Sequence, residues 1–122
     1  NIELEIILKD PDLTLEADTD LIEQVLINLI LNAADAVKEV ASPRILLSAY
    51  ITTSNKVVIK VADNGIGISA DLMEKIFIPF FSTRKTGSGI GLSLCKQIMM
   101  LHKGNIKVQS VAGEGTAFLL LF

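Results

Sequence analysis

The feature that most constrains this chain is an apolar run over residues 21–40. Such a run is far too long for a strand, so it predicts a helix of about five turns. Asp18 and Asp20 precede it as candidates for the N-cap, and Glu23 follows Asp20 by three residues, the spacing of a capping box. The helix is apolar nearly all round except for one narrow stripe, which needs an explanation.

Four polar residues at spacings of four, four and three form this stripe: Gln24, Asn28, Asn32 and Asp35. An ordinary solvent-facing surface is one interpretation. Solvent faces draw mostly on Lys, Glu and Arg, whereas short amides and one carboxylate suit a site that coordinates a cation or holds a ligand. The composition of the stripe therefore favours a site.

Short β-branched or apolar segments, separated by turns, predict strands over residues 2–8, 13–17, 44–52, 57–62, 106–111 and 116–122. Helical patterns appear again over residues 69–77 and 92–102. Most of the strands follow one another as hairpins, with helices between the pairs. This order predicts an α+β fold, a two-layer sandwich in which the helices pack on one face of a mixed, mostly antiparallel sheet.

Composition limits the function. The 122 residues suffice for one domain, and a net charge of −3 with a pI near 5.0 argues against nucleic-acid binding, which needs clustered Lys and Arg. The chain has one cysteine, Cys95, which we expect to be structural in a reducing, cytoplasmic compartment. No apolar stretch reaches membrane-span length, so we expect a soluble piece of a longer protein that is itself either soluble or membrane-anchored.

A second candidate site begins where the strand over residues 57–62 ends, in the sequence Asp-Asn-Gly-Ile-Gly-Ile over residues 63–68. Asn-Gly is also a strong hairpin signal, but the next segment is predicted to be helical rather than a partner strand. Glycines at 65 and 67 would then let a ligand approach the backbone closely. Asp63 can accept a hydrogen bond from the exocyclic amine of adenine, while guanine would present a repelled oxygen.

A third candidate site is Gly-Ser-Gly-Ile-Gly-Leu over residues 87–92, which opens a helix where unpaired backbone N–H groups make a phosphate site. It lacks the third glycine of a dinucleotide fingerprint and is not a GxxxxGK[ST] loop. Arg84 and Lys85 lie just upstream in a polar run. They are either solvated loop charges or part of a lid over the terminal phosphates of a nucleotide.

The order of five motifs resembles the catalytic domains of sensor histidine kinases, in the superfamily shared with gyrase, the Hsp90 chaperone and MutL. These motifs are NLILNA at 28–33, DNGIGI at 63–68, IFIPFF at 76–81, GSGIGL at 87–92 and GEGT at 113–116. The Ala-Ala-Asp-Ala sequence at 33–36 is closest in style to nitrogen-regulation-type kinases. The resemblance implies a Bergerat-type ATP-binding fold spanning residues 1–122 and a site for ATP and Mg2+.

Site residues follow from the resemblance position by position. Asn32 resembles the magnesium-binding asparagine, with Asn28 one turn earlier as its helper, Asp63 resembles the residue that recognises the adenine amine, and Thr116 resembles the threonine that reaches the adenine pocket. The full set of nucleotide-binding residues that the resemblance implies is Asn28, Asn32, Asp35, Asp63, Gly65, Gly67, Ile68, Arg84, Lys85, Gly87, Ser88, Gly89, Ile90, Gly91, Leu92 and Thr116.

Two further features bear on the lid. Phe77, Pro79, Phe80 and Phe81 match the aromatic box that flanks the family's lid, and we expect them to anchor it by packing more than to touch ATP. Asp35 stands where many histidine kinases carry a basic residue facing the phosphates, so Arg84 or Lys85 is expected to supply that charge. The loop before residue 87 is short, which implies a small lid.

The resemblance also selects among reactions. Hydrolytic members of the superfamily carry a carboxylate one turn before the magnesium asparagine, and here that position is Asn28. The domain is therefore expected to hold ATP and to donate the γ-phosphate to a histidine of a separate dimerisation domain, for use by a response regulator. An anti-sigma-factor-type serine kinase and a non-catalytic nucleotide-binding module are the alternatives.

The acceptor histidine is expected outside this chain. His102 is the only histidine and lies at the end of a predicted helix, before Lys103 and Gly104. There a partly cationic ring would suit the helix dipole. We therefore expect His102 to be structural, and the isolated chain to bind ATP as a monomer with little autophosphorylation.

Overall fold

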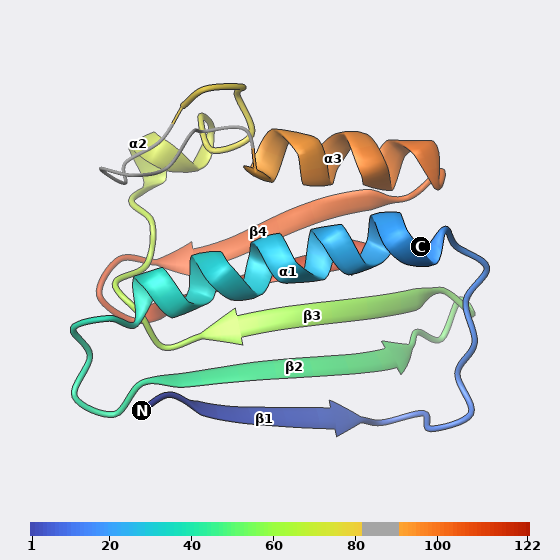
Figure 1. Ribbon diagram of the computed structural model, residues 1–122, viewed down its shortest axis with the longest axis horizontal. Coiled ribbons are helices and arrows are strands. Elements are labelled where there is room, and N and C mark those ends of the chain that lie inside the picture. The colour runs from blue at the N-terminus through green and yellow to red at the C-terminus, as the bar shows by residue number, and fades with distance from the viewer. Residues whose placement is uncertain (82–90) are drawn as a thin grey trace.

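A five-stranded mixed sheet, with its strands in the order β1-β2-β3-β5-β4, forms one layer of the computed structural model, which describes residues 1–81 and 91–122 (Figure 1). Only β1 and β2 are parallel, while the pairs β2–β3, β3–β5 and β4–β5 are antiparallel. The strands are β1 (Glu3–Leu8), β2 (Arg44–Ile51), β3 (Val57–Asp63), β4 (Asn105–Val111) and β5 (Gly115–Leu121). The predicted α+β class and the mixed, mostly antiparallel sheet are confirmed.

Helix α1 (Thr19–Ala36) begins at the predicted N-cap but ends earlier than predicted. The Asp18 carboxylate caps it by accepting a 3.1 Å hydrogen bond from the N–H of Leu21. At the other end, the carbonyl of Ala36 accepts from the N–H of Ile66 instead of Val40, whose N–H turns back to Val37. A strand-end loop thus takes over the bond that the next helical turn would need, so the predicted extension to residue 40 is wrong.

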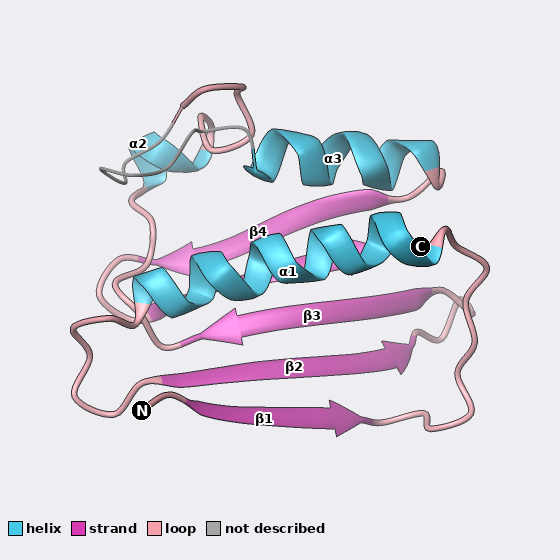
Figure 2. Cartoon of the chain, in the orientation of Figure 1, coloured by secondary structure: helices cyan, strands magenta, loops and turns pink. Residues whose placement is uncertain are grey.

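The helices lie on one face of the sheet (Figure 2). Helix α1 packs over β2, β3 and β5, and α3 (Gly91–Leu101) packs beside α1 and over β4. Fully buried side chains join the layers, among them Val25, Leu29, Val61, Met99 and Leu120. This apolar core fixes the two helices relative to the strand ends, where the polar residues of the candidate sites lie.

Two predicted elements differ in the structure. Residues 13–17 form no strand, although Leu13 and Leu15 keep the alternate half-burial that suggested one. This segment runs past the strand ends toward the start of α1 rather than alongside β1, so it has no ladder partner (Figure 1). The helix predicted over 69–77 shortens to α2 (Ala70–Met73) and then continues as turns. There the N–H groups of Lys75 and Ile78 bond the carbonyls of Leu72 and Lys75, three residues back, which is the pattern of tight turns rather than of an α-helix.

Within the described ranges, no helix combines the length and the hydropathy needed to cross a bilayer.

Candidate functional site

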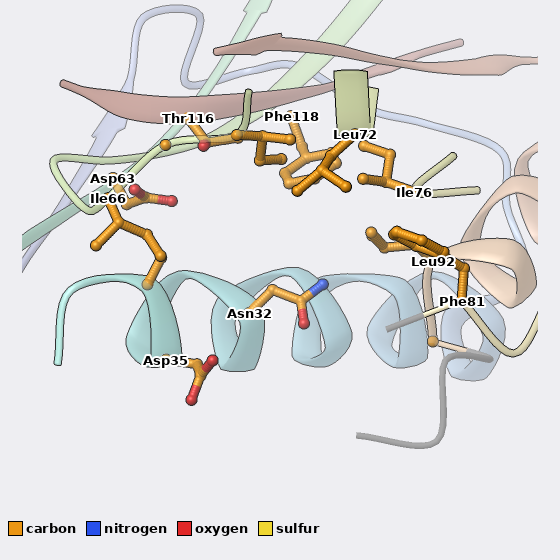
Figure 3. Close-up of a pocket in the computed structure, with 14 residues that line it drawn as sticks. Asn32, Asp35, Asp63, Ile66, Leu72, Ile76, Phe81, Leu92, Thr116 and Phe118 are labelled. Atoms are coloured by element: carbon orange, nitrogen blue, oxygen red, sulfur yellow. The ribbon is translucent and has the colours of Figure 1, made fainter. Parts of the chain in front are cut away.

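A cavity of about 350 Å³ lies between α1, the end of β3, the start of β5, α2 and the first turn of α3. Figure 3 shows Asp63, Ile66 and Thr116 at one end of it, and Leu72, Ile76, Phe81 and Leu92 at the other. The lining residues are Asn32, Asp35, Ala36, Asp63, Ile66, Gly67, Ile68, Leu72, Ile76, Phe81, Gly91, Leu92, Thr116 and Phe118. Eight residues predicted from the sequence therefore meet around one space: Asn32, Asp35, Asp63, Gly67, Ile68, Gly91, Leu92 and Thr116.

Asp63 is the last residue of β3, and its half-buried carboxylate lines this cavity. Its Oδ1 accepts a 2.8 Å hydrogen bond from the N–H of Gly65. Burial raises the pKa of Asp63 above its ordinary value, while backbone hydrogen bonds from Gly65 and Thr116 act in the opposite direction. The carboxylate is thus held in place at the cavity wall, where its charge is only partly solvated.

The two glycines after Asp63 have roles in protein packing. A Cβ on Gly65 would lie 2.4 Å from the carbonyl oxygen of Ala36, because the loop crosses the end of α1. A Cβ on Gly67 would lie 2.2 Å from the carbonyl oxygen of Val111, and Gly67 has a φ of +74°. Gly67 lines the cavity but Gly65 does not, so Gly65 serves the site by bending the loop and donating to Asp63. The Asn-Gly pair does not form a hairpin.

The remaining side chain of this motif, Asn64, points into another part of the fold. Its Oδ1 accepts a 2.8 Å hydrogen bond from the N–H of Arg44, and its Nδ2 donates to the carbonyl of Ser42 at 2.8 Å. Asn64 therefore attaches the site loop to the start of β2.

Thr116 is paired with Asp63 across β3 and β5 and with Ser110 across β5 and β4. The three side chains form one polar row on the helix-covered face. Thr116 is only 6% exposed, and its Oγ1 lies 2.8 Å from Oγ of Ser110. Ser110 belongs to no sequence motif, and only the strand register could have identified it.

Only part of the polar stripe of α1 belongs to the cavity. Asn32 and Asp35 line the cavity, whereas Gln24 and Asn28 do not. Asp35 forms a 3.3 Å ion pair with Lys38, and in Figure 3 its carboxylate points away from Asp63. Lys38 was not anticipated from the sequence. Its side chain is 74% exposed, so this pair adds little stability but places a cation beside the cavity rim.

Asn28 faces the start of α3 instead. Its Oδ1 would lie 3.6 Å from a Cβ on Gly91. One turn further along α3, the thiol of Cys95 donates to the carbonyl of Val25 on α1, with sulfur and oxygen 3.9 Å apart. Cys95 is fully buried, and burial raises its pKa to about 11. The cysteine is therefore structural, a protonated thiol between α1 and α3.

The aromatic residues of the segment 76–81 have different positions: Phe77 packs against the rest of the protein, and Phe81 lines the cavity. Phe77 packs edge-on against Phe118, with ring centroids 6.4 Å apart, and Lys96 lies over its ring at 5.5 Å. Phe81 lines the cavity, and the expectation that these aromatics anchor the lid by packing more than they touch ATP stays a prediction. Leu72, Ile76 and Phe118 complete an apolar wall that was not predicted from the sequence, although Phe118 follows Thr116 by two residues on the same strand face.

Six of the predicted residues lie outside the described residues: Arg84, Lys85, Gly87, Ser88, Gly89 and Ile90. Their roles stay predictions.

His102 joins the far ends of the two long helices. Its Nε2 accepts a 3.0 Å hydrogen bond from the N–H of Asp18, and its Nδ1 lies 2.8 Å from the carbonyl oxygen of Ile98. An acceptor at Nε2 and a carbonyl beside Nδ1 require the neutral ring with its proton on Nδ1. The expected partly cationic ring is therefore wrong, and both nitrogens already have partners.

Across the part of the chain that the structure describes, no three His, Cys, Asp or Glu side chains gather into a metal-binding group.

Comparison with known proteins agrees with this arrangement. The family model described as "Histidine kinase-, DNA gyrase B-, and HSP90-like ATPase" matches residues 17–122. The signal transduction histidine-protein kinase AtoS of Escherichia coli K12 is 38% identical over 107 residues, which are 88% of this chain and 17% of AtoS. The matched residues thus span about a sixth of the length of that relative.

Solved structures give the same result. The catalytic domain of histidine kinase ThkA has a TM-score of 0.85 and 34% identity, covering 99% of this chain and 78% of that one. Full-length ShkA, solved in complex with AMPPNP, has a TM-score of 0.82 and 29% identity, covering 98% of this chain and 25% of ShkA. The chain therefore belongs to the histidine kinase-, gyrase B- and HSP90-like ATPases, and it matches the nucleotide-binding catalytic domains of the sensor histidine kinases among them.

Proposed function

We propose that this chain binds Mg-ATP in the cavity and donates the γ-phosphate to a histidine on a separate dimerisation domain of the same protein. One observation carries the proposal: a half-buried carboxylate, Asp63, is fixed beside Thr116 at one end of a mostly apolar cavity. A flat apolar ring with an amine at its edge satisfies both the apolar wall and the acceptors.

The preference for adenine is proposed from the residues that line the cavity. Ile66, Ile68 and Leu72 offer apolar surface to the two faces of a purine, and Asp63 offers oxygen lone pairs to its amine. An oxygen in place of that amine would face the carboxylate and be repelled. The site is therefore expected to prefer adenine over guanine or hypoxanthine.

The magnesium part of the proposal rests on Asn32. Its neutral amide lies in the cavity wall, and a neutral ligand suffices because the triphosphate carries the charge. When bound, Mg2+ would neutralise part of the charge on the phosphate oxygens. Asn28 lies one turn earlier on α1 and is directed at Gly91, so it is proposed as a helper that acts at the start of α3 rather than in the cavity wall.

Transfer rather than hydrolysis is proposed because α1 has no base in the position that would activate water. Asn28 occupies that position, and the carboxylate of Asp35 is paired with Lys38. Without an activated water, the γ-phosphate remains available to an incoming histidine nitrogen. Arg84 and Lys85 are proposed to contact it from the lid. Arg84→Ala should then reduce phosphotransfer more than ATP binding.

The partners are proposed from the relatives. AtoS is named a signal transduction histidine-protein kinase, and ThkA has also been solved in complex with the response regulator TrrA. We propose that residues 1–122 act as the cytoplasmic catalytic domain of a longer protein, whose dimerisation domain carries the acceptor histidine and whose phosphate passes to a response regulator. The parent is either soluble or membrane-anchored.

The test combines binding with transfer. The chain is titrated with ATP by calorimetry with and without Mg2+, and is then mixed with radiolabelled ATP and the dimerisation domain of its parent protein. Acid-labile phosphohistidine on the dimerisation domain is the expected product. Acid-stable phosphoserine on a partner would indicate a serine kinase, and no binding of ATP would refute the proposal.

Variants make the assignment specific. Asn32→Ala should remove most of the Mg2+-dependent gain in ATP affinity and leave the magnesium-free affinity within about twofold. Asp71→Asn is the matched control, because Asp71 is an exposed carboxylate of α2 that does not line the cavity. Unchanged magnesium dependence in Asn32→Ala would contradict the role of Asn32.

A further inference from the structure

Ser110, on β4, contacts three groups of the candidate site through one oxygen. Its Oγ accepts a 2.7 Å hydrogen bond from the N–H of Ile68 and donates a 2.9 Å hydrogen bond to the carbonyl of Gly115. The third contact, at 2.8 Å, is with Oγ1 of Thr116. Ser110 thereby connects the loop after Asp63 with the start of β5.

The donors and acceptors of this cluster can be assigned from chemistry. A serine hydroxyl has one proton and two lone pairs. The carbonyl of Gly115 can only accept, so it takes the proton of Ser110, and the N–H of Ile68 can only donate, so it takes one lone pair. The hydrogen bond between Ser110 and Thr116 must then use the other lone pair. Thr116 is therefore the donor in that bond.

This assignment fixes what Thr116 offers to the cavity. With its only proton directed at Ser110, Oγ1 of Thr116 has nothing but lone pairs left. Its neighbour in the strand register is Asp63, whose carboxylate also presents lone pairs. The polar end of the cavity is consequently an acceptor on both sides, which favours a ligand edge that carries N–H groups.

We propose that Ser110 is a positioning residue for nucleotide selectivity: it holds the Thr116 hydroxyl as an acceptor and thereby makes the pocket prefer an exocyclic amine over a carbonyl. The inference rests on the proposed binding of ATP in this cavity. Without Ser110, the Thr116 hydroxyl is free to rotate and to donate into the cavity. A purine with an oxygen in place of the amine would then meet a donor as well as the carboxylate.

The test compares ATP with inosine triphosphate, whose hypoxanthine has an oxygen where adenine has the amine. Affinities for both are measured by calorimetry for the 122-residue chain and its Ser110→Ala variant. The preference for ATP should fall by about tenfold, the effect of one reversed hydrogen bond of about 1.4 kcal/mol. Ser110→Thr retains the hydroxyl and should keep the preference within about twofold.

A purely structural role of Ser110 predicts another result. A loosened loop would lower both affinities by the same factor, and the preference for ATP would not change. Thr116→Val provides the second criterion. If Ser110 acts through Thr116, the double variant Ser110→Ala with Thr116→Val should have the same preference as Thr116→Val alone. Ser48→Ala, on the opposite face of the sheet in β2, is the matched control and should change neither affinity.

The outcomes separate this inference from the function on which it rests. An unchanged ATP preference in Ser110→Ala, or an additive loss in the double variant, would overturn the role of Ser110 alone. A wild-type chain that binds both nucleotides equally, or neither, would overturn the proposed function as well. If Ser110→Ala does not fold, Ser110→Cys takes its place, because a thiol of similar size is a weak hydrogen-bonding group and should lose the preference too.

Discussion

The carboxylate of Asp63 accepts a 2.8 Å hydrogen bond from the backbone N–H of Gly65, two residues further along the chain. The same turn brings Ile66 to the end of α1, where its N–H bonds the carbonyl of Ala36. The proposed purine-recognising group and the end of the main helix are thus connected within the four residues 63–66. A change in this loop is expected to alter both ligand binding and stability.

The burial of Asp63 predicts a pH dependence. Because burial raises its pKa, Asp63 becomes protonated at a higher pH than an exposed aspartate, and ATP affinity should decline there as pH falls. Asp63→Asn should lower ATP affinity by about 10- to 100-fold at neutral pH, the range for a hydrogen bond to a charged group. Calorimetry over a pH series measures both effects. An affinity in the variant equal to wild type would contradict the role of Asp63.

The same raised pKa makes the folding stability of the ligand-free chain depend on pH in the opposite direction to its ATP affinity. In the native state Asp63 holds its proton more tightly than in the unfolded chain, so its contribution to stability is present at low pH and is lost as pH rises through the native pKa. Asp63→Asn should therefore raise the melting temperature of the ligand-free chain at neutral pH, and this gain should shrink under acid conditions. A lower melting temperature at neutral pH would contradict the burial argument.

Gly67 predicts a large packing effect. A Cβ there would meet the carbonyl of Val111 at 2.2 Å, and alanine at a φ of +74° is strained. Gly67→Ala should cost about 3 kcal/mol or more of unfolding free energy and weaken ATP binding. Gly113 offers a matched control, with a φ of +83° but no atom within 4 Å, so Gly113→Ala should cost only about 1–2 kcal/mol. Equal costs in urea unfolding would refute the close contact.

We predict that the thiol of Cys95 is alkylated slowly in the native chain. Its thiol is fully buried between α1 and α3, with its pKa raised to about 11. At neutral pH the native chain should react with iodoacetamide at least about a hundredfold more slowly than the chain in guanidinium. Mass spectrometry over time gives the rates, with Cys95→Ser as the blank. Labelling at the unfolded rate under native conditions would show that the two helices do not pack as described.

We predict that replacing His102 lowers the stability of the chain without weakening ATP binding. His102→Ala removes one hydrogen bond to the N-cap of α1 and a second to the carbonyl of Ile98 in α3, and should cost about 1–2 kcal/mol of unfolding free energy. ATP affinity should stay within about twofold of wild type. Gln97→Ala, at an exposed position of α3, is the control. Phosphate found on His102 after incubation with ATP would contradict its structural role.

Most of the fold follows from the hydrophobic periodicity of the sequence and from the turn and capping residues between its segments. Helix α3 was predicted over 92–102 and runs from Gly91 to Leu101, and the hairpins β2–β3 and β4–β5 were predicted nearly to the residue. The failures involve long-range partners. The alternation over 13–17 is real, but no strand lies beside it, and α1 stops short because Ile66 takes the carbonyl of Ala36. Neither effect is visible in a local window.

The residues of the candidate site were likewise only partly predictable from the sequence. Asp63, Asn32 and Thr116 carry polar chemistry at positions that a motif reveals, and all three line the cavity. Ser110 and Lys38 acquire their meaning only from the strand register and the helix surface. The glycines show a further limit, because sequence indicates that position 65 needs a glycine but not that the close neighbour is the carbonyl of Ala36 rather than a ligand.

The proposed function requires that the purine of ATP be recognised at the end of β3. A crystal structure of the chain with a non-hydrolysable ATP analogue and Mg2+ tests it most directly. The exocyclic amine should lie within hydrogen-bonding distance of the Asp63 carboxylate, with the phosphates extending toward Asn32 and the start of α3. A purine bound away from position 63 would contradict it.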